Sequence, residues 1–547
     1  MKNLGSKLIC LNLVLALCFV VTGCKEAIPG DPIDKLSLKV YPASPESPNP
    51  YDQVAFMRIA VDGDTISATH KFVQYTGSLS TPQVLDTIPF GKNLRIIIKN
   101  WSTKAGGLGK LVSRGRSIFF DMTPDSSPVQ LNVILSRTNT FSRTTAIGAS
   151  GTFSTGLSQG RVGQSVTKLM DGRILVLGGA SLKTGVSQFK SSDDLQQILA
   201  TAEIYDPLTG QFTLLSGPNA SMANPRAYHT ATLLDIDSVE LAGKVLISGG
   251  ISEISGTKQT LALVQLFDPV TLQFEPVSVD AMAMSRAGHT ATLLDGIGHV
   301  ALIGGFRVDP SGVMSTINTL EVYKPGDGKI WETALNGARY FHTATRAPLG
   351  KDGKDAIVIV GGESDSQVLD TIEIFNFIGD TPGVELSNDT LFGGSRTQHG
   401  ANYVASQKFI HITGGYTNKN YSEVEGIIDS YHTESKVIRI PDVAGGENPF
   451  QMLIPRAGHA AINMENNVIL LFGGHTGLEL TSSAEVIYEY YNTTTDKIII
   501  ERGGVGAMSG PRNGHSGVLL DDGTVLTVGG LSAPATLVTK GEFFNPL

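Results

Sequence analysis

The stretch RAGHTATLLDGIGHVALIGG, from Arg286 to Gly305, decides the fold, because variants of it recur along most of the chain. It begins with an arginine, has a histidine three residues later, and ends as an apolar run that meets two glycines. The apolar run with its glycine pair occurs seven times, the second glycine standing at positions 179, 250, 305, 362, 415, 474 and 530. Self-similarity of this kind predicts an array in which each repeat is one supersecondary unit.

Both flanks of each glycine pair repeat as well. Upstream stands Arg161, Arg226, Arg286, Arg339, Arg396, Arg456 or Arg512, with a histidine three residues on in every unit except the first, which has Gln164. Downstream comes an acid or amide, then an apolar residue and an aromatic one, as in EIYDP (203–207) and QLFDP (265–269). The best copies add a second aromatic residue after a turn, for example Phe212.

These units resemble kelch repeats, whose mark is an apolar run, a Gly-Gly pair and spaced aromatic residues. Their spacing of 53 to 71 residues is slightly longer than the ~50 residues of that family, and Phe replaces Trp in most copies. The resemblance covers about residues 140–547 and implies an all-β fold, a seven-bladed kelch β-propeller. Four short strands form a sheet that cannot cover both of its faces alone, and radial stacking of sheets buries those faces.

The C-terminus predicts how the ring closes. The chain ends in GEFFNPL (541–547), which supplies a third strand without a fourth. The stretch SGTF (150–153) would continue that phrase as LTGQF (208–212) continues the first unit. We therefore expect residues 141–156 to complete the last blade.

The N-terminus reads as an export signal. Lys2 and Lys7 precede an apolar run and then VTGC (21–24), the order expected of a secretory signal. VTGC resembles the bacterial lipobox, which implies cleavage of residues 1–23, lipid on Cys24, and a location at the outer membrane or cell surface. The Pro- and Ser-rich residues 24–51 predict a tether.

Residues 52–138 contain short alternating apolar segments bounded by turn residues. This pattern predicts a small β-sandwich, and the segment IPFGKNLRIIIK (88–99) resembles immunoglobulin-like or transthyretin-like modules. The propeller is then expected over residues 139–547.

Composition excludes several functions. A formal charge of −9 argues against nucleic acid as a partner, because binders of the phosphate backbone concentrate Lys and Arg. The three cysteines are Cys10, Cys18 and Cys24, so the copper–cysteine chemistry of galactose-oxidase-like kelch enzymes is excluded. No cofactor is predicted. No metal site is predicted either, because histidines spread around a ring do not converge on one ion.

Two hypotheses account for the seven arginines. The resemblance implies that residues entering the first strand lie near the central channel, on a face where kelch domains hold partners. The seven arginines, with Tyr228 and Tyr340, would then bind carboxylate or phosphate groups. Alternatively, each Arg and His braces adjacent blades through backbone carbonyls, which also explains their recurrence.

The leading interpretation is a lipid-anchored envelope protein that presents the propeller to a protein or glycan partner. Variable loops usually carry specificity in such folds, and residues 180–201 and 376–394 depart most from the repeat. The alternative is a propeller enzyme acting on carbohydrate, similar to kelch-type sialate mutarotases, although their acid–base residues do not map onto this sequence. Whether the chain is an enzyme is left open.

Overall fold

The structure is a computed structural model. It describes residues 13–16, 36–44, 46–63, 66–74, 91–103, 109–117, 120–122, 129–148, 151–277, 281–294, 296, 298–349, 354–377, 383–439, 442–443, 449–492 and 497–546. Most of the predicted signal peptide, the lipobox and the predicted lipidation site Cys24 lie outside these residues. Within them, no helix has the length and apolar character needed to cross a lipid bilayer.

The N-terminal part forms one connected eight-stranded sheet. Its strands are β1 (Leu13–Ala16), β2 (Leu36–Pro42), β3 (Phe56–Gly63), β4 (Ile66–Gln74), β5 (Gly91–Trp101), β6 (Leu111–Arg116), β7 (Phe120–Met122) and β8 (Val129–Arg137). Alternate side chains of a strand point to opposite faces of the sheet. In β5 the alternate residues Leu94, Ile96 and Ile98 are fully buried and belong to one apolar core. The two-sheet sandwich predicted from the sequence is not confirmed. The predicted tether contains a strand, because β2 pairs in parallel with β8.

Seven antiparallel sheets follow, and in each of them the strands pair in the order first, second, third, fourth within the described residues. The first three sheets are β12 (Ser165–Lys168), β13 (Ile174–Leu177), β16 (Ala202–Asp206) and β17 (Gln211–Leu214); β18 (Thr230–Leu233), β19 (Val245–Ser248), β22 (Val264–Asp268) and β23 (Gln273–Phe274); and β24 (Thr290–Leu293), β25 (Val300–Ile303), β28 (Thr319–Lys324) and β29 (Gly328–Ala334). The fourth and fifth are β30 (Thr343–Leu349), β31 (Lys354–Val360), β32 (Thr371–Asn376) and β33 (Gly383–Thr390); and β34 (Gly400–Val404), β35 (Phe409–Thr413), β36 (Asp429–His432) and β37 (Val437–Arg439).

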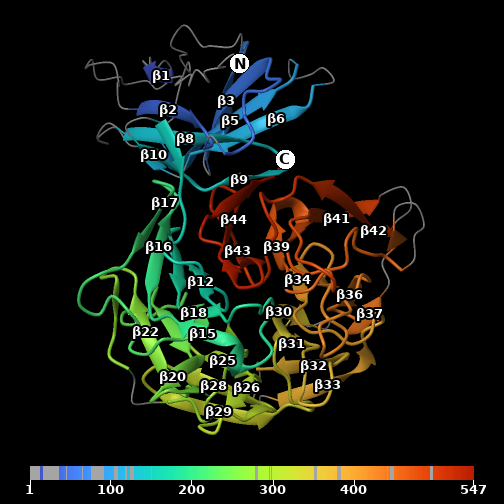
Figure 1. Cartoon of the computed structure of the whole chain (residues 1–547). Coiled ribbons are helices and arrows are strands. Elements are labelled where there is room, and N and C mark those ends of the chain that lie inside the picture. Colours follow the sequence, from blue (N-terminus) through green and yellow to red (C-terminus); the bar gives the residue numbers. More distant parts are fainter. Residues whose placement is uncertain are drawn as a thin grey trace, which may run out of the picture.

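The last two sheets depart slightly from this plan. The sixth has β39 (Ala460–Met464), β40 (Val468–Phe472), β41 (Ala484–Asn492) and β42 (Lys497–Val505), with β38 (Asp442–Val443) added in parallel to β42. The seventh has β43 (Ser516–Leu519), β44 (Val525–Val528), β47 (Glu542–Asn545) and, from the other end of the chain, β9 (Thr140–Arg143). Figure 1 shows the sheets arranged around a ring, with the N-terminal strands beside β9 and the C-terminus.

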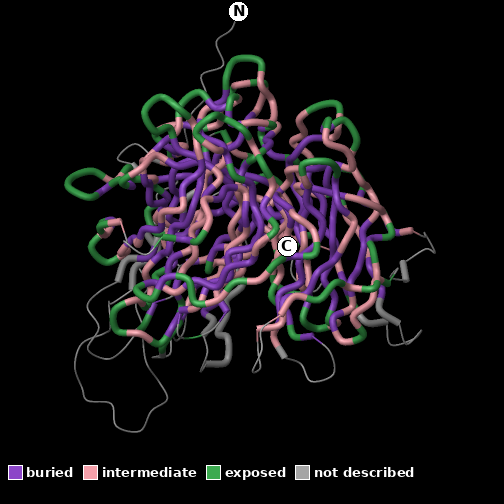
Figure 2. Tube along the Cα trace, turned by 90° about the horizontal axis from the view of Figure 1, so that it is seen from below, coloured by how far each residue is buried: buried purple, intermediate pink, exposed green. Residues whose placement is uncertain are grey.

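Short hairpins and turns complete the structure. They are β10 (Thr145–Gly148) with β11 (Gly151–Ser154), β14 (Ala180–Leu182) with β15 (Leu195–Ile198), β20 (Ile251–Ile254) with β21 (Thr257–Thr260), β26 (Phe306–Val308) with β27 (Met314–Thr316), β45 (Leu531–Ala533) with β46 (Thr536–Leu537), and the 3₁₀ turns η1 (Ser192–Asp194) and η2 (Glu465–Asn467). In Figure 2 the buried segments gather within the sheets and the exposed ones at the turns.

The glycine pairs join neighbouring sheets. Gly304 and Gly305 have φ of 56° and 101°, and a Cβ on Gly304 would lie 2.4 Å from the Arg339 carbonyl oxygen. Only glycine fits such a place without strain. The second glycine of each pair donates its N–H to the carbonyl of the next motif arginine; these bonds run from Gly179, Gly250, Gly305, Gly362, Gly415, Gly474 and Gly530 to Arg226, Arg286, Arg339, Arg396, Arg456, Arg512 and Arg161. The seventh bond links the last sheet to the first. The arrangement is propeller-like.

The closing strand lies earlier than the stretch SGTF. β9 pairs with β47 so that Phe141 faces Phe544, with ring centroids 5.2 Å apart. Residues 151–154 instead form a hairpin with β10. Burial explains the difference: Phe141 is 4% exposed within the core, whereas Phe153 of SGTF is 47% exposed.

Candidate binding face

All seven motif arginines are fully buried, and six of them pair with an acid on the third strand of their own sheet. The pairs are Arg161–Glu203, Arg286–Glu321, Arg339–Glu373, Arg396–Asp429, Arg456–Glu485 and Arg512–Glu542. These acids are the first residues of the downstream motif. Their role was missed in the sequence, although their regular spacing was visible.

Arg339 shows what each arginine holds. Its Nη2 pairs with Glu373, and its Nη1 donates to the carbonyl oxygen of Gly361 (2.8 Å), the first residue of a glycine pair. Burial lowers the pKa of Arg339, while the nearby Glu373 carboxylate opposes that shift. This geometry is that of a brace within one sheet. That the arginines bind a ligand stays a prediction, and none of the seven side chains is exposed to solvent here.

Arg226 is the exception, because Gln265 occupies the place of the acid. Its Nη1 donates to the carbonyls of Gly249 (3.2 Å) and Leu263 (2.9 Å). Burial lowers the pKa of Arg226 to about 10. The second sheet thus holds a buried cation with no carboxylate beside it among the described residues.

Replacing Arg339 with alanine is expected to destabilise the protein by about 3–5 kcal/mol, because Glu373 would remain buried without its partner. Arg226→Ala is the matched control. It leaves no carboxylate behind, so it should cost about 1–3 kcal/mol, the range for unsatisfied backbone acceptors. Urea unfolding of both variants measures the difference. Equal losses would contradict a bracing role for the ion pairs.

Five of the six motif histidines connect neighbouring sheets through a side-chain hydrogen bond. A ring Nε2 bonds to a hydroxyl of the preceding sheet in the pairs His229–Ser165 (2.8 Å), His289–Thr230 (3.1 Å), His342–Thr290 (3.0 Å), His399–Thr343 (2.9 Å) and His459–Thr413 (3.2 Å). Gln164 takes the place of the histidine in the first unit, where its Nε2 donates to Ser516 Oγ of the seventh sheet (3.0 Å). Among the described residues, no group of three or more His, Cys, Asp or Glu side chains is placed to hold a metal ion.

Strained backbone marks the third position of the motif, between arginine and histidine. Four units have glycine there, and Tyr228, Phe341 and Gln398 occupy it in the second, fourth and fifth units with φ of 57°, 51° and 54°. Bulky residues rarely adopt positive φ, and retained strain of this kind clusters at functional sites. Backbone bonds join these positions across sheets; Phe341, for example, donates to Gly288 (3.1 Å) and Gln398 donates to Phe341 (3.1 Å).

A loop lies over these strained residues. The covering loop, residues 180–201, contains β14, η1 and β15. Its Phe189 is 6% exposed, and the Phe189 ring centroid lies 4.3 Å from that of Tyr228, 5.9 Å from that of Phe306 and 6.2 Å from that of Phe341. The rings it contacts belong to three successive units of the array. Tyr228, predicted to bind a partner, is therefore partly covered by the chain itself.

Polar contacts also join the covering loop to the fifth and seventh units. Gln188 donates to the hydroxyl of Tyr416 (2.6 Å), and Lys190 donates to the carbonyl of Asn420 (3.2 Å). The Ala535 N–H donates to the Val186 carbonyl in the last unit (2.9 Å). The loop is thus fixed by the second to fifth units and the seventh.

Tyr340, the other tyrosine predicted to bind, is 5% exposed and lies beside a buried carboxylate. Glu363 accepts a hydrogen bond from the Tyr421 hydroxyl (2.5 Å), and the Tyr340 hydroxyl also bonds to it. Burial raises the pKa of Glu363, and the two phenols oppose that shift. Nothing in the repeat pattern pointed to this cluster, because Glu363 and Tyr421 lie outside the motif.

Comparison with known proteins adds little to these observations. No protein-family model and no curated protein matches the chain. A solved structure entitled "Structure of YjhT" is similar over 63% of this chain and 99% of its own, at 13% sequence identity and a TM-score of 0.42. The chain is a nearly all-β protein with a propeller-like arrangement of sheets.

Proposed function

We propose that the chain is a lipid-anchored binding protein of the cell envelope, in which a seven-bladed kelch propeller presents the covering loop to a protein or glycan. The repeated motif and the ring of glycine–arginine backbone bonds support the propeller. The lipobox-like VTGC (21–24) supports the anchor.

The covering loop is the observation that carries the binding proposal. Binding residues are disproportionately found on loops that a rigid scaffold positions, and this loop is held by aromatic and polar contacts to five units. Its outer side exposes Lys183, Thr184, Asp193 and Gln196. A surface that is already fixed loses little conformational entropy when it binds a partner.

The carbohydrate-enzyme alternative has less support. The buried arginines are engaged by their acids, and Glu363 is engaged by two phenols. Catalysis needs a titratable group within reach of a substrate, and the covering loop lies above this cluster. The second predicted partner loop, residues 376–394, contains β33, which pairs with β32 in the fourth sheet.

Binding is tested with the soluble chain from residue 25, probed against envelope proteins and a glycan array. A Thr184→Arg/Gln196→Arg double variant should abolish capture of the partner without changing the melting temperature, because both side chains are exposed. Turnover of sialic acid in a mutarotation assay, or equal capture by wild type and variant, would contradict the proposal.

The anchor is tested separately. Cells fed a palmitate analogue should label the wild-type chain and a Cys18→Ser variant, whereas Cys24→Ser should lose the label, because only a thiol at the cleavage site receives lipid. Both cysteines belong to the N-terminal segment. Labelling of the Cys24→Ser variant would exclude the proposed anchor.

A further inference from the structure

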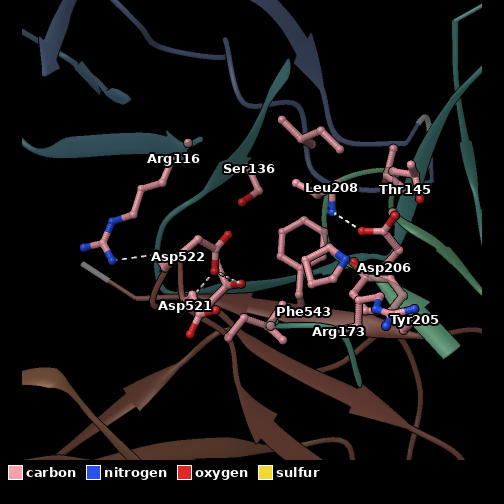
Figure 3. A pocket seen from close by; sticks show the side chains of 18 of the residues that line it. Arg116, Ser136, Thr145, Arg173, Tyr205, Asp206, Leu208, Asp521, Asp522 and Phe543 are labelled. Atoms are coloured by element: carbon pink, nitrogen blue, oxygen red, sulfur yellow. Dashed lines mark hydrogen bonds between the residues drawn. The ribbon is translucent and has the colours of Figure 1, made fainter. Parts of the chain in front are cut away.

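A cavity of about 660 Å³ lies between the N-terminal sheet and the ring. Its walls come from β6 and β8, from the turns of the first sheet, and from β47 and the β43–β44 turn of the seventh. Figure 3 shows Asp521 and Asp522 on one side of it and Tyr205 and Asp206 on the other. Small-molecule sites have volumes of ~300–1,000 Å³ and favour places between domains.

Hydrogen bonds fix the walls of this cavity. The Asn545 Nδ2 donates to the carbonyls of Arg114 (3.0 Å) and Ser136 (2.9 Å), which joins the last strand to the N-terminal sheet. Arg116 Nη1 donates to the Asp522 carbonyl (2.5 Å) and pairs with Glu465 (3.5 Å). These bonds cross from one sheet system to the other, so the cavity is preformed.

Its lining combines aromatic rings with oxygen acceptors. Tyr205 and Phe543 supply rings, and Leu208, 52% exposed, supplies an apolar rim. Asp206 Oδ1 accepts from the Leu208 N–H (2.8 Å), and Asp522 Oδ1 accepts from the Thr524 N–H (2.9 Å) and hydroxyl (2.6 Å). In each case one oxygen holds the turn, and Oδ2 has no partner among the described residues.

Tyr205 lines the cavity on the side of Asp206, across from Asp522. Burial raises the pKa of Tyr205, and the charges of Asp522 and Asp206 raise it further. The hydroxyl has no hydrogen-bond partner among the described residues, and it is not fully enclosed. One phenol and two carboxylates therefore line the cavity from its two sides.

The charges in the lining nearly balance. Three arginines face four aspartates: Arg114, Arg116, Arg173, Asp171, Asp206, Asp521 and Asp522. Several are already paired, including Arg173 with Asp171 (2.7 Å). Neither a strong anion nor a strong cation is favoured in such a site, because each would meet charges of its own sign.

We propose that this cavity binds an uncharged, hydroxyl-rich ligand of mono- or disaccharide size. Sugar hydroxyl groups donate to the open Oδ2 atoms of Asp206 and Asp522, and one accepts a hydrogen bond from the Tyr205 hydroxyl. The apolar face of the sugar ring packs against Phe543 and Leu208. The proposal is independent of the covering loop, because no residue of that loop lines the cavity. The ligand is either a free sugar or the terminal sugar of a glycan.

The test measures binding of glucose, galactose, N-acetylglucosamine and maltose by calorimetry, and of neutral glycans on an array. Asp206→Asn should weaken binding about tenfold or more, because it removes a hydrogen bond to a charged group. Tyr205→Phe removes a neutral hydrogen bond and should weaken binding about two- to tenfold. Asp268→Asn is the matched control, because Asp268 Oδ1 holds the same turn (2.8 Å to the Val270 N–H) in the second sheet, away from the cavity.

The melting temperature of each variant shows whether a loss of binding comes from the cavity or from unfolding of the protein. Binding of free sugars supports a small-molecule ligand, and binding to the array alone supports a glycan end. Absence of binding to every probe at millimolar concentration would overturn the proposal. So would equal affinity of wild type, Tyr205→Phe and Asp206→Asn.

Discussion

Lowering the pH from 7 to 5 is expected to destabilise the protein by about 2 kcal/mol for each buried motif histidine. The ordinary pKa of histidine is ~6.5, so about 1.5 of these pH units lie below it, and each unit is worth ~1.4 kcal/mol. Burial lowers the pKa of His229, His342 and His515 to about 3, and holds those of His289, His399 and His459 well below the usual 6.5. The folded chain keeps these rings neutral, whereas the unfolded chain takes up protons below pH 6.5. Their contribution is complete above pH 6.5 and is lost as the pH falls toward 3.

Six such losses together rival the ~5–15 kcal/mol that stabilises a typical protein, so the melting temperature should fall steeply between pH 7 and 5. Two opposite variants test the cause. His342→Gln imitates the first unit and should flatten the pH dependence by about one sixth, whereas Gln164→His should steepen it. An unchanged slope in both variants would show that other groups control the response to acid.

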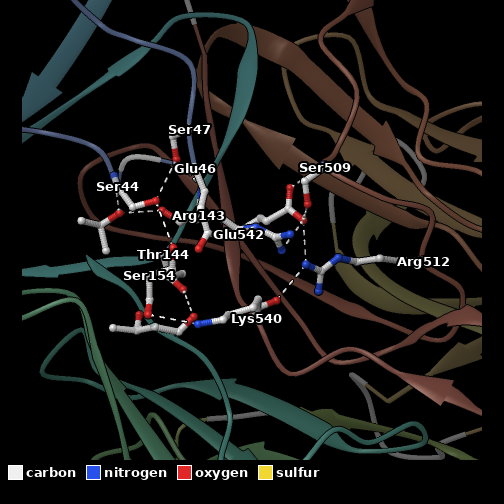
Figure 4. Close-up of polar contacts among 12 residues, drawn as sticks. Ser44, Glu46, Ser47, Arg143, Thr144, Ser154, Ser509, Arg512, Lys540 and Glu542 are labelled. Carbon is white, nitrogen blue, oxygen red and sulfur yellow. Dashed lines mark hydrogen bonds and ion pairs between the residues drawn. The ribbon is translucent and has the colours of Figure 1, made fainter. Parts of the chain in front are cut away.

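Removal of the closing strand is expected to destabilise the ring by about 5 kcal/mol or more, because loss of a buried Phe alone costs ~3–5 kcal/mol and an unpaired strand edge is exposed. A chain from residue 158 loses Phe141, whose ring lies 5.3 Å from that of Phe472 and 5.2 Å from that of Phe544. It also loses Arg143, which pairs with Glu542 (3.3 Å), as Figure 4 shows.

A chain from residue 139 is the matched control. It keeps β9 and should unfold with one cooperative transition close to that of the longer chain. Its loss is limited to contacts such as those of Asn545 with the N-terminal sheet. Thermal unfolding by circular dichroism compares the two chains, and equal melting temperatures would contradict closure by β9.

Local pattern predicted those parts of the fold that repeat. The glycine pairs located the second strands, because an apolar run that ends in two glycines is typical of a buried strand followed by a turn. In VALIGG (300–305) all four residues of β25 are buried, and both glycines have positive φ. The aromatic after the acid located the third strands, for example Tyr205 in β16. The hypothesis that the Arg and His residues brace adjacent sheets also came from their recurrence along the chain. In the structure the Arg339 side chain bonds within its own sheet, whereas the His399 side chain bonds to a hydroxyl of the preceding sheet.

Long-range packing decided what the pattern missed. The stretch SGTF matched the missing strand in sequence, but Phe141 rather than Phe153 reaches the core. The covering loop and the cavity lie where segments distant in sequence meet, as Phe189 meets Phe341 and Arg116 meets Asp522. No sequence motif indicates these long-range contacts, because nothing in the local sequence around each residue distinguishes it from its neighbours.

Hydrogen–deuterium exchange of residues 542–545 tests the closed ring most directly. In the chain that starts at residue 139, the amides of β47 that face β9 should exchange as slowly as those of β44, the strand on its other side. In the chain that starts at residue 158, they should exchange rapidly while β44 stays protected. Slow exchange of residues 542–545 in both chains, or rapid exchange in both, would contradict a ring whose last sheet is built from the two ends of the chain.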